Sequence, residues 1–406
     1  MRTGIDGRRL RSIKSRAEIL DAAEALFGTT GYDATSLRAI AQAIGMSTPG
    51  LQRHFATKAD VLTALLARIQ NRNEEHLASF ASTAVSPREF TTLLAAQRME
   101  KPHELELTTI LLGEATDPEH PAHDYLASRF DRTLQRLSGA FGERSLEVYA
   151  GWSGLVLLWS YFPERIDPVA LLEAWIRRLE ENAVDGKSGS KAGDAARVVA
   201  EVDYRLPVRA READEVGGKL TERRIVEAAA RAFARGGYRP TSLRQIATDL
   251  ETSHGALLYW FANKQALLEA VLGSRDPNLP TSFATSDEAL AALSAVYPLA
   301  RANEADLDQV RLYQVLVCES VDPAHPAHGF FERRYGVVIA RFTAAMTVLQ
   351  EAGILRPELD PEEEAVWLTA LWDGLQLHSF YRLGLDVPER LRRHLNTLLT
   401  VTLPPV

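Results

Sequence analysis

Apolar residues recur every three to four positions along most of the chain, which is the spacing of one face of an α-helix. In Ile19–Phe27 they stand at i, i+3, i+4, i+7 and i+8, and Ile225–Phe233 repeats this arrangement. No stretch alternates apolar and polar residues for long enough to form a sheet. The pattern therefore predicts an all-α fold.

The front of this pattern occurs twice. When the chain is shifted by 206 positions, Ile19–Leu66 aligns with Ile225–Leu272 without a gap, and 20 of the 48 positions are identical. Behind each copy, EATDPEHPAH (Glu114–His123) returns as ESVDPAHPAH (Glu319–His328). Trp152, Gly154 and Leu155 return more loosely as Trp372, Gly374 and Leu375. The chain is predicted to be a tandem duplication of one helical protein, because the period is too long for a solenoid repeat.

The duplication divides the chain into five predicted segments. Residues 1–70 and 219–273 are the two front domains, and residues 71–184 and 274–406 are the helical domains that follow them. Between the copies, residues 185–218 include DGKSGSKAGDAA, and this Gly, Ser and Ala content predicts a flexible linker.

Each front domain has the layout of a helix-turn-helix. Thr35-Ser36 and Thr241-Ser242 are good N-caps for a second helix, and Ser47 and Ser253 are good N-caps for a short third helix. A helix of this size fits the major groove of DNA, which is about 12 Å wide. Within the third helices, Leu51/Leu257 and Phe55/Phe261 are identical and predicted to face inward. The outward positions differ: Thr48/His254, Pro49/Gly255, Gly50/Ala256, Gln52/Leu258, Arg53/Tyr259 and His54/Trp260. We expect the copies to read different base sequences; neutral drift of exposed residues is the alternative.

Lys58 and Lys264 each follow a capping residue in the first turn of a fourth helix, capped by Thr57 or Asn263. The helix dipole disfavours a cation there by some tenths of a kcal/mol. A lysine kept there in both copies favours a phosphate contact, and a solvated lysine is the alternative.

Both front domains resemble the DNA-binding domain of the tetracycline-repressor (TetR) family. The resemblance lies in ILDAAEALFGTTGYDATSLRAIAQAIGMSTPGLQRHFATKADVL and IVEAAARAFARGGYRPTSLRQIATDLETSHGALLYWFANKQALL. Their helices, glycine and final Phe-x-x-Lys-x-x-Leu/Val-Leu have the family spacing. The resemblance implies a transcriptional regulator, usually a repressor, that binds double-stranded operator DNA and is released by a small molecule. It also implies that each helical domain binds ligand and dimerises.

The family's DNA contacts are carried over onto matching positions of this sequence. Its phosphate contacts fall on Thr35, Thr57, Lys58, Thr241 and Lys264. Its base contacts fall on Thr48, Pro49, Gly50, Gln52, Arg53, His254, Gly255, Leu258 and Tyr259. The remaining candidate DNA-binding residues are Ser36, Arg38, His54, Ser242, Arg244 and Trp260.

Two features depart from the family pattern. Gln52 and Leu258 stand where the family often has tyrosine, and Glu251 replaces the turn residue Gly45 of the first copy. If that turn needs a positive φ, Glu251 costs on the order of 1 kcal/mol. Together with the apolar Leu258 and Trp260, this supports an alternative function: one or both front domains no longer read DNA, and the chain works through ligand or protein contacts.

Charge and composition narrow the picture further. The net charge of −8 argues against a surface that is basic all over, yet residues 1–16 carry six Arg or Lys and one acidic residue. This basic arm is predicted to contact DNA, with a solvated tail as the alternative. The single cysteine excludes an intrachain disulfide, no apolar run reaches the length of a membrane helix, and the start lacks the apolar part of a signal peptide. We expect a cytoplasmic protein that does not enter the membrane.

The chain offers little for catalysis or metal binding. The repeated DPxHPAH motif spaces His120 from His123, and His325 from His328, as two metal ligands can be spaced, but no carboxylate or cysteine joins them at usable spacing. The motif is predicted to be a loop entering a helix. No Ser-His-Asp pattern, phosphate loop or dinucleotide fingerprint is present, so neither an enzyme nor a cofactor is expected. Cys318 lies on an apolar stretch and is predicted to be buried.

The last two helices of each copy are rich in aromatic residues: Gly151–Phe162 with Asp167–Leu179, and Glu364–Tyr381 with Pro388–Leu399. In the family such a pair packs on its dimer mate as a four-helix bundle. One copy is therefore expected to serve as the mate of the other, which makes the chain a pseudo-dimer; a homodimer of the chain is the alternative. A small apolar or aromatic effector is expected in a pocket of the helical domains. The candidate pocket residues are Trp152, Trp159, Trp372 and His378.

Overall fold

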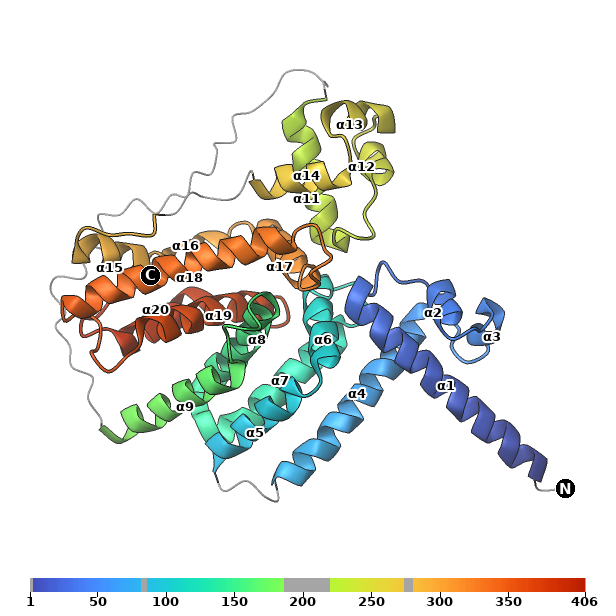
Figure 1. Ribbon diagram of the computed structural model, residues 1–406, viewed down its shortest axis with the longest axis horizontal. Helices are drawn as coiled ribbons and strands as arrows, with labels where there is room; N and C mark the ends of the chain where they lie inside the picture. The colour runs from blue at the N-terminus through green and yellow to red at the C-terminus, as the bar shows by residue number, and fades with distance from the viewer. Residues whose placement is uncertain (1–2, 82–85, 186–219, 274–279, 406) are drawn as a thin grey trace.

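The computed structural model describes residues 3–81, 86–185, 220–273 and 280–405, and the regular elements in these ranges are helices (Figure 1). The all-α prediction is confirmed. The predicted linker, residues 185–218, lies outside the described residues except for Asp185.

The first copy contains α1 (Thr3–Thr30), α2 (Leu37–Ala43), α3 (Thr48–Gln52), α4 (Lys58–Ala81), α5 (Pro87–Met99), α6 (Pro102–Glu114), α7 (His123–Phe141), the 3-10 turn η1 (Gly142–Arg144), α8 (Ser145–Tyr161) and α9 (Pro168–Asp185). The second copy contains α11 (Glu222–Gly236), α12 (Leu243–Asp249), α13 (His254–Trp260), α14 (Lys264–Gly273), α15 (Ser286–Ser294), α16 (Val296–Asn303), α17 (Leu307–Glu319), α18 (His328–Glu351), α19 (Pro361–Ser379) and α20 (Val387–Leu398).

The front domains begin their helices where the sequence predicts. The hydroxyl oxygens of Ser36 and Ser47 accept backbone N–H groups three residues on, at 3.1 and 3.2 Å, and so cap α2 and α3. Ser242 and Ser253 cap α12 and α13 in the same way, at 3.2 and 3.1 Å. The predicted inward residues of the third helices are buried.

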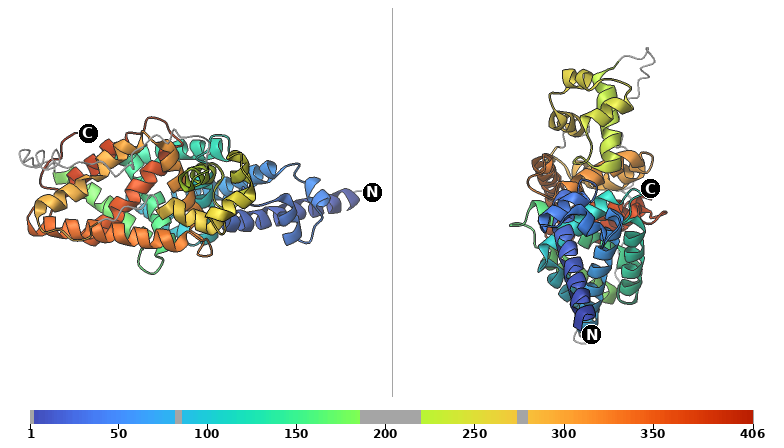
Figure 2. Two further views of the ribbon diagram at one scale, coloured as in Figure 1. Left: turned by 90° about the horizontal axis from the view of Figure 1, so that it is seen from above. Right: turned by 90° about the vertical axis from the view of Figure 1, so that its right-hand side faces the viewer.

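The predicted domain borders and the arm differ from the observed helices. Helix α4 continues to Ala81, so the predicted border between residues 70 and 71 falls inside a helix. Helix α1 begins at Thr3, so the basic arm is the first part of the helix that continues into the front domain. Figure 2 shows this helix projecting beyond the remainder of the molecule.

The two copies meet through α8 and α19, which make the most extensive helix contact in the described chain. A Cβ on Gly154 would lie 1.8 Å from the carbonyl oxygen of Ala370, and a Cβ on Gly374 would lie 1.9 Å from that of Ala150. The two backbones therefore touch at a pair of reciprocal positions. Only glycine allows this approach, which explains why these two glycines match in the sequence.

Helices α9 and α20 flank this contact and complete a four-helix arrangement within one chain. The indole of Trp175 on α9 stacks on Trp367 of α19, with ring centroids 4.5 Å apart. Arg178 of α9 pairs with Glu364 of α19, and Arg390 of α20 pairs with Glu147 of α8 at 2.9 Å. Both carboxylates are buried, so each pairing offsets a desolvation cost of several kcal/mol.

The first DPxHPAH loop joins three parts of the molecule. His120 accepts the N–H of Ala122 at its Nδ1 and packs edge-on against Tyr32 of the first front domain, 5.0 Å between centroids. His123 bonds to the carbonyl of Ala115 and stacks on Tyr381, which belongs to the second copy. The motif therefore forms packing contacts, and in the described residues no three His, Cys, Asp or Glu side chains are grouped as metal ligands would be.

The second loop repeats these contacts. His325 accepts the N–H of Ala327 and packs edge-on against Tyr238, while His328 stacks on Tyr161 of the first copy. Tyr161 donates its hydroxyl to the carbonyl of Val317 at 2.6 Å, just as Tyr381 donates to Leu112 at 2.6 Å. Each copy thus closes on the other through a tyrosine at or just beyond the end of its penultimate helix.

A carboxylate connects each front domain to the helical domain behind it. Glu114, the last residue of α6, accepts the N–H of Tyr32 at 2.9 Å, and Glu319, the last residue of α17, accepts the N–H of Tyr238 at 2.6 Å. Helices α6 and α17 also pack on each other, where the buried Cys318 faces Gly113. Both front domains lie at the α6 and α17 end of the molecule, away from α9 and α20 (Figure 1). Among the described residues, no helix is long and apolar enough to cross a membrane.

Candidate nucleic-acid interface

Helix α3, the third helix of the first front domain and its predicted reading helix, has a polar outer face. Pro49, Gln52 and Arg53 are exposed, whereas Thr48, Gly50 and His54 are half-buried. The backbone carbonyl of His54 accepts the guanidinium of Arg16 at 2.7 Å, and this guanidinium also lies over the ring of Phe55. Arg16 therefore holds α1 against the C-terminal end of the reading helix. From the sequence, this arginine was only one of the basic residues of the arm, and its contact with the reading helix was not predicted.

The outer face of the second reading helix is apolar. Leu258, Tyr259 and Trp260 are 41%, 84% and 41% exposed, and they are three of the six large hydrophobic side chains found exposed in the described residues. The rings of Tyr259 and Trp260 meet edge to face with centroids 5.8 Å apart. His254 is half-buried and Gly255 is exposed. The two reading surfaces therefore differ in chemistry, since Arg53 corresponds to Tyr259 and Gln52 to Leu258.

The predicted threonine contacts lie inside the protein. Thr35 and Thr241 are buried, and their hydroxyls donate to the carbonyls of Gly31 and Gly237 at 2.6 and 2.7 Å. Because a hydroxyl has a single hydrogen to donate, this geometry does not support a side-chain bond from either threonine to a phosphate. Their observed role is to fix the turn that follows the first helix.

The exposed serine and arginine beside each threonine keep their polar groups at the surface. Ser36 and Ser242 use their oxygen to cap a helix, which leaves the hydroxyl hydrogen for an outside acceptor. Arg38 and Arg244 are exposed in the first turns of α2 and α12. These four residues therefore remain candidates for phosphate binding on geometric grounds.

Lys58 and Lys264 are bound by backbone carbonyls. The ammonium of Lys264 donates to Tyr238, Arg239 and Thr241 at 2.9–3.1 Å, which uses its three hydrogens. That of Lys58 donates to Tyr32 at 2.7 Å and to Asp33 at 3.2 Å. Burial lowers the pKa of both side chains. The lysines therefore fasten the fourth helix to the turn after the first, and a phosphate would have to displace these carbonyls.

The fourth helix of the first copy has a reciprocal cap. Thr57 accepts the N–H of Asp60 at 3.1 Å, and Asp60 accepts the N–H of Thr57 at 2.8 Å. Asn263 accepts the N–H of Ala266 at the equivalent place in the second copy. Thr57 is exposed, so its hydroxyl hydrogen also remains open to a phosphate.

The turn before each reading helix has a left-handed residue. Gly45 has φ 65°, and Glu251 has φ 53°, the one positive φ outside glycine in the described residues. The condition on which the sequence argument for strain at Glu251 depended is therefore met. The second front domain therefore carries backbone strain that the first avoids.

Comparison with known proteins agrees with this geometry. Residues 19–65 and residues 225–271 each match the model described as bacterial regulatory proteins, tetR family. The chain carries the DNA-binding domain of the tetR family. No curated protein matches the sequence. Each matched segment covers the helix-turn-helix and the first turns of the following helix, so this domain occurs twice in the chain.

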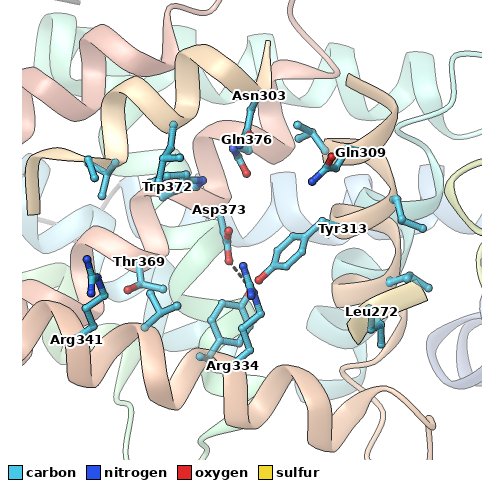
Figure 3. A pocket seen from close by; sticks show the side chains of 18 of the residues that line it. Leu272, Asn303, Gln309, Tyr313, Arg334, Arg341, Thr369, Trp372, Asp373 and Gln376 are labelled. Carbon is cyan, nitrogen blue, oxygen red and sulfur yellow. Dashed lines mark hydrogen bonds between the residues drawn. The ribbon is translucent and has the colours of Figure 1, made fainter. Parts of the chain in front are cut away.

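Behind the second front domain, the helical domain of the second copy contains a cavity of about 260 Å³ (Figure 3). Of the four predicted pocket residues, Trp372 lines it. His378 is buried elsewhere, where it bonds to Ser153 at 2.9 Å. Trp152 and Trp159 are half-buried against the core and do not line this cavity. The aromatic content of the sequence pointed to α8 and α19, of which α19 contributes Trp372 to the cavity wall. It could not separate the aromatic residues that line the cavity from those that pack in the core.

Proposed function

We propose that the chain is a transcriptional repressor in which the two copies act as a pseudo-dimer on one operator. The observation that carries this proposal is the reciprocal backbone contact of α8 and α19 at Gly154 and Gly374. It supplies within one chain the helix pairing that a tetR-family protomer forms with a mate. Tethering further favours pairing within the chain over pairing between chains, because it raises the local concentration of one copy near the other.

The operator proposed here has unequal halves. Arg53 is exposed and suited to a bidentate bond with guanine, whereas Tyr259 and Leu258 offer apolar contact of the kind that recognises a thymine methyl group. Around them, Ser36, Arg38 and their counterparts in the second copy would bind phosphates and fix the register. The first half-site is therefore proposed to contain guanine and the second to favour A·T pairs.

Release from the operator is proposed to follow binding of a small, mainly apolar molecule in the cavity of the second copy. Val271 and Leu272 line this cavity, and both belong to α14, the helix that follows the second reading helix. A ligand there touches the front domain directly. It can shift the DNA-bound state only if it binds that state less well than the released state.

Selection of binding sites from a random duplex pool with the full chain tests the proposal. Two different half-sites should emerge, and Arg53→Ala should relax base preference in one half only, with a loss of about 1–3 kcal/mol. Tyr259→Ala should relax the other half. Arg136→Ala, an exposed arginine of α7, is the matched control and should leave selection unchanged. A perfect palindrome, affected equally in both halves by Arg53→Ala, would contradict the unequal operator.

A second candidate function follows from the apolar face of α13. Three neighbouring exposed hydrophobic side chains are unusual on a surface that binds the phosphate backbone. In this alternative the second front domain binds a protein instead of DNA. Selected sites that contain a single half-site, unaffected by Tyr259→Ala, would favour it.

A further inference from the structure

We propose that the cavity of the second copy binds one uncharged, mainly apolar molecule that carries a hydroxyl or amide group, and that each chain takes one such ligand. This inference deepens the proposed function, on which its regulatory meaning rests. It concerns the chemistry and the number of ligands.

Most of the cavity wall is apolar, and its residues come from the six helices α14 to α19. Val296, Leu299, Leu316, Val338 and Phe342 are among the residues that line it. A wall of this kind recognises a hydrocarbon skeleton by removing it from water, at about 25 cal/mol per Å². The body of the ligand is therefore apolar.

A polar cluster, formed by Tyr313, Arg334, Tyr335 and Asp373, interrupts this wall, and the uncharged polar residues Asn303, Gln309, Thr369 and Gln376 line other parts of it. Tyr335 donates its hydroxyl to the carboxylate of Asp373, and both residues are buried. Figure 3 shows Tyr313, Arg334 and Asp373 with their polar ends turned toward one another, while Arg341 lies away from them. Burial raises the pKa of Asp373 to about 6, while the hydrogen bond from Tyr335 and the charge of Arg334 oppose this rise. Arg334 is therefore the cationic neighbour that balances the charge of this carboxyl group.

This balance selects against charged ligands. A buried cation would compete with Arg334 for Asp373, and a buried anion would be repelled by Asp373 itself. Either ion would therefore lose its hydration without gaining an opposite charge that is not already paired. Arg341 is engaged at the margin, where it donates to the carbonyl of Pro280 and lies over the ring of Phe283. A hydroxyl or amide can both donate to Asp373 and accept from Tyr313 or Arg334, so it meets the cluster without adding charge.

The first copy keeps only the arginine of this cluster, although the same helices are present. The loop motif aligns α6 and α7 with α17 and α18 at a shift of 205, and Gly154 aligns α8 with α19 at a shift of 220. Tyr313, Tyr335 and Asp373 then correspond to Thr108, Phe130 and Ser153, while Arg334 corresponds to Arg129. The carboxylate and both phenols are therefore absent from these positions of the first copy.

In the first copy, the residues equivalent to the cluster pack against a side chain of the second. The ring of His378 lies 4.8 Å from Phe130 and 4.7 Å from Tyr149, and its Nε2 meets the hydroxyl of Ser153 at 2.9 Å. Tyr149 corresponds to the smaller Thr369 of the second copy, and His378 corresponds to Leu158. The larger Tyr149 leaves less room at this place in the first copy, and the cavity lies in the second copy, so one ligand per chain is expected.

Calorimetric titration of the full chain without DNA tests this directly. The probes are 4-butylphenol, butylbenzene, 4-butylbenzoate and 4-butylbenzylammonium, which share a skeleton and differ in the polar group. We expect 4-butylphenol to bind once per chain and about tenfold or more tighter than either ion. Asp373→Asn leaves Arg334 without its counter-charge, so this variant should gain affinity for 4-butylbenzoate. A purely structural role of Asp373 would not produce such a gain.

A matched pair of variants tests the location. Val338→Trp should fill the cavity and abolish binding, whereas Thr133→Trp, at the equivalent place in the first copy, should not. Melting curves of both variants identify any that fail to fold, and Asp373→Asn then carries the test. Four results would each overturn the inference. Two concern the unmodified chain: tightest binding of one of the two ions, or binding of two ligands per chain. The other two are loss of binding in folded Thr133→Trp and failure of 4-butylphenol to bind up to about 1 mM. If 4-butylphenol binds as expected but does not release DNA, the ligand assignment stands and the proposed ligand-controlled function fails.

Discussion

Replacement of Glu251 by glycine is expected to stabilise the second front domain. Glu251 has φ 53°, and a left-handed backbone costs a residue with a Cβ roughly 1–2 kcal/mol. Glycine removes this cost but loses about 0.5–1 kcal/mol more backbone entropy on folding. The difference leaves a net gain of about 1 kcal/mol for Glu251→Gly.

Amide hydrogen exchange in the full chain measures this gain where it arises. The second front domain is one part of a larger protein, so a single unfolding transition would not isolate it. Amides of α12 and α13 that exchange by local opening should slow about fivefold for 1 kcal/mol. Amides of α2 and α3, in the first front domain, should be unchanged.

Two further variants separate backbone strain from the loss of the glutamate side chain. Glu251→Ala removes the carboxylate but keeps the cost of the positive φ, so exchange should stay near that of the unmodified chain. Gly45→Glu should destabilise the first front domain by a similar amount, because a Cβ on Gly45 would meet no atom within 4 Å and only the backbone cost remains. Equal slowing by Glu251→Ala and Glu251→Gly would refute the strain argument.

Three other predictions address different parts of the molecule. Burial raises the pKa of Glu114 from 4.5 to about 8, so between these pH values the folded chain keeps a proton that the unfolded chain loses. The free energy of unfolding should therefore fall as the pH rises from about 5 to 8. Urea titration at several pH values measures this fall, and Glu114→Gln should flatten it. Removal of residues 1–15 deletes five basic residues, and the slope of log affinity against log salt should flatten by up to about four, whereas an unchanged slope would identify the arm as a solvated tail. Gly154→Ala should cost about 1–3 kcal/mol or more in urea unfolding because it forces α8 from α19, while Gly139→Ala, an exposed helical glycine with no neighbour near its Cβ, should be neutral or stabilising.

The helices and their caps could be predicted because their causes are local. A serine before a helical pattern caps that helix wherever it occurs, and all four predicted serine caps of the reading domains are present. The positive φ at Glu251 was predictable for a related reason: comparison of the two copies exposed a glycine position, and glycine at a turn indicates a particular backbone angle.

Burial and partners of single side chains could not be read in the same way. Thr35 and Lys58 stand at positions that contact DNA in the family, yet in this chain their polar groups bond to internal carbonyls. The cavity depends on which helices leave a gap, and the sequence shows only that Trp372 is aromatic. Gly154 and Gly374 align when the two copies are compared. Their role could not be predicted, because it depends on how closely the backbone of the opposite helix approaches each glycine.

One chain is proposed to supply both front domains of a single DNA-binding unit. Light scattering of the full chain at micromolar concentration, alone and on its selected duplex, measures the number of chains in that unit. We expect a protein mass near 44.9 kDa in both samples, with one chain per duplex. A protein mass of about twice that value in either sample would contradict it.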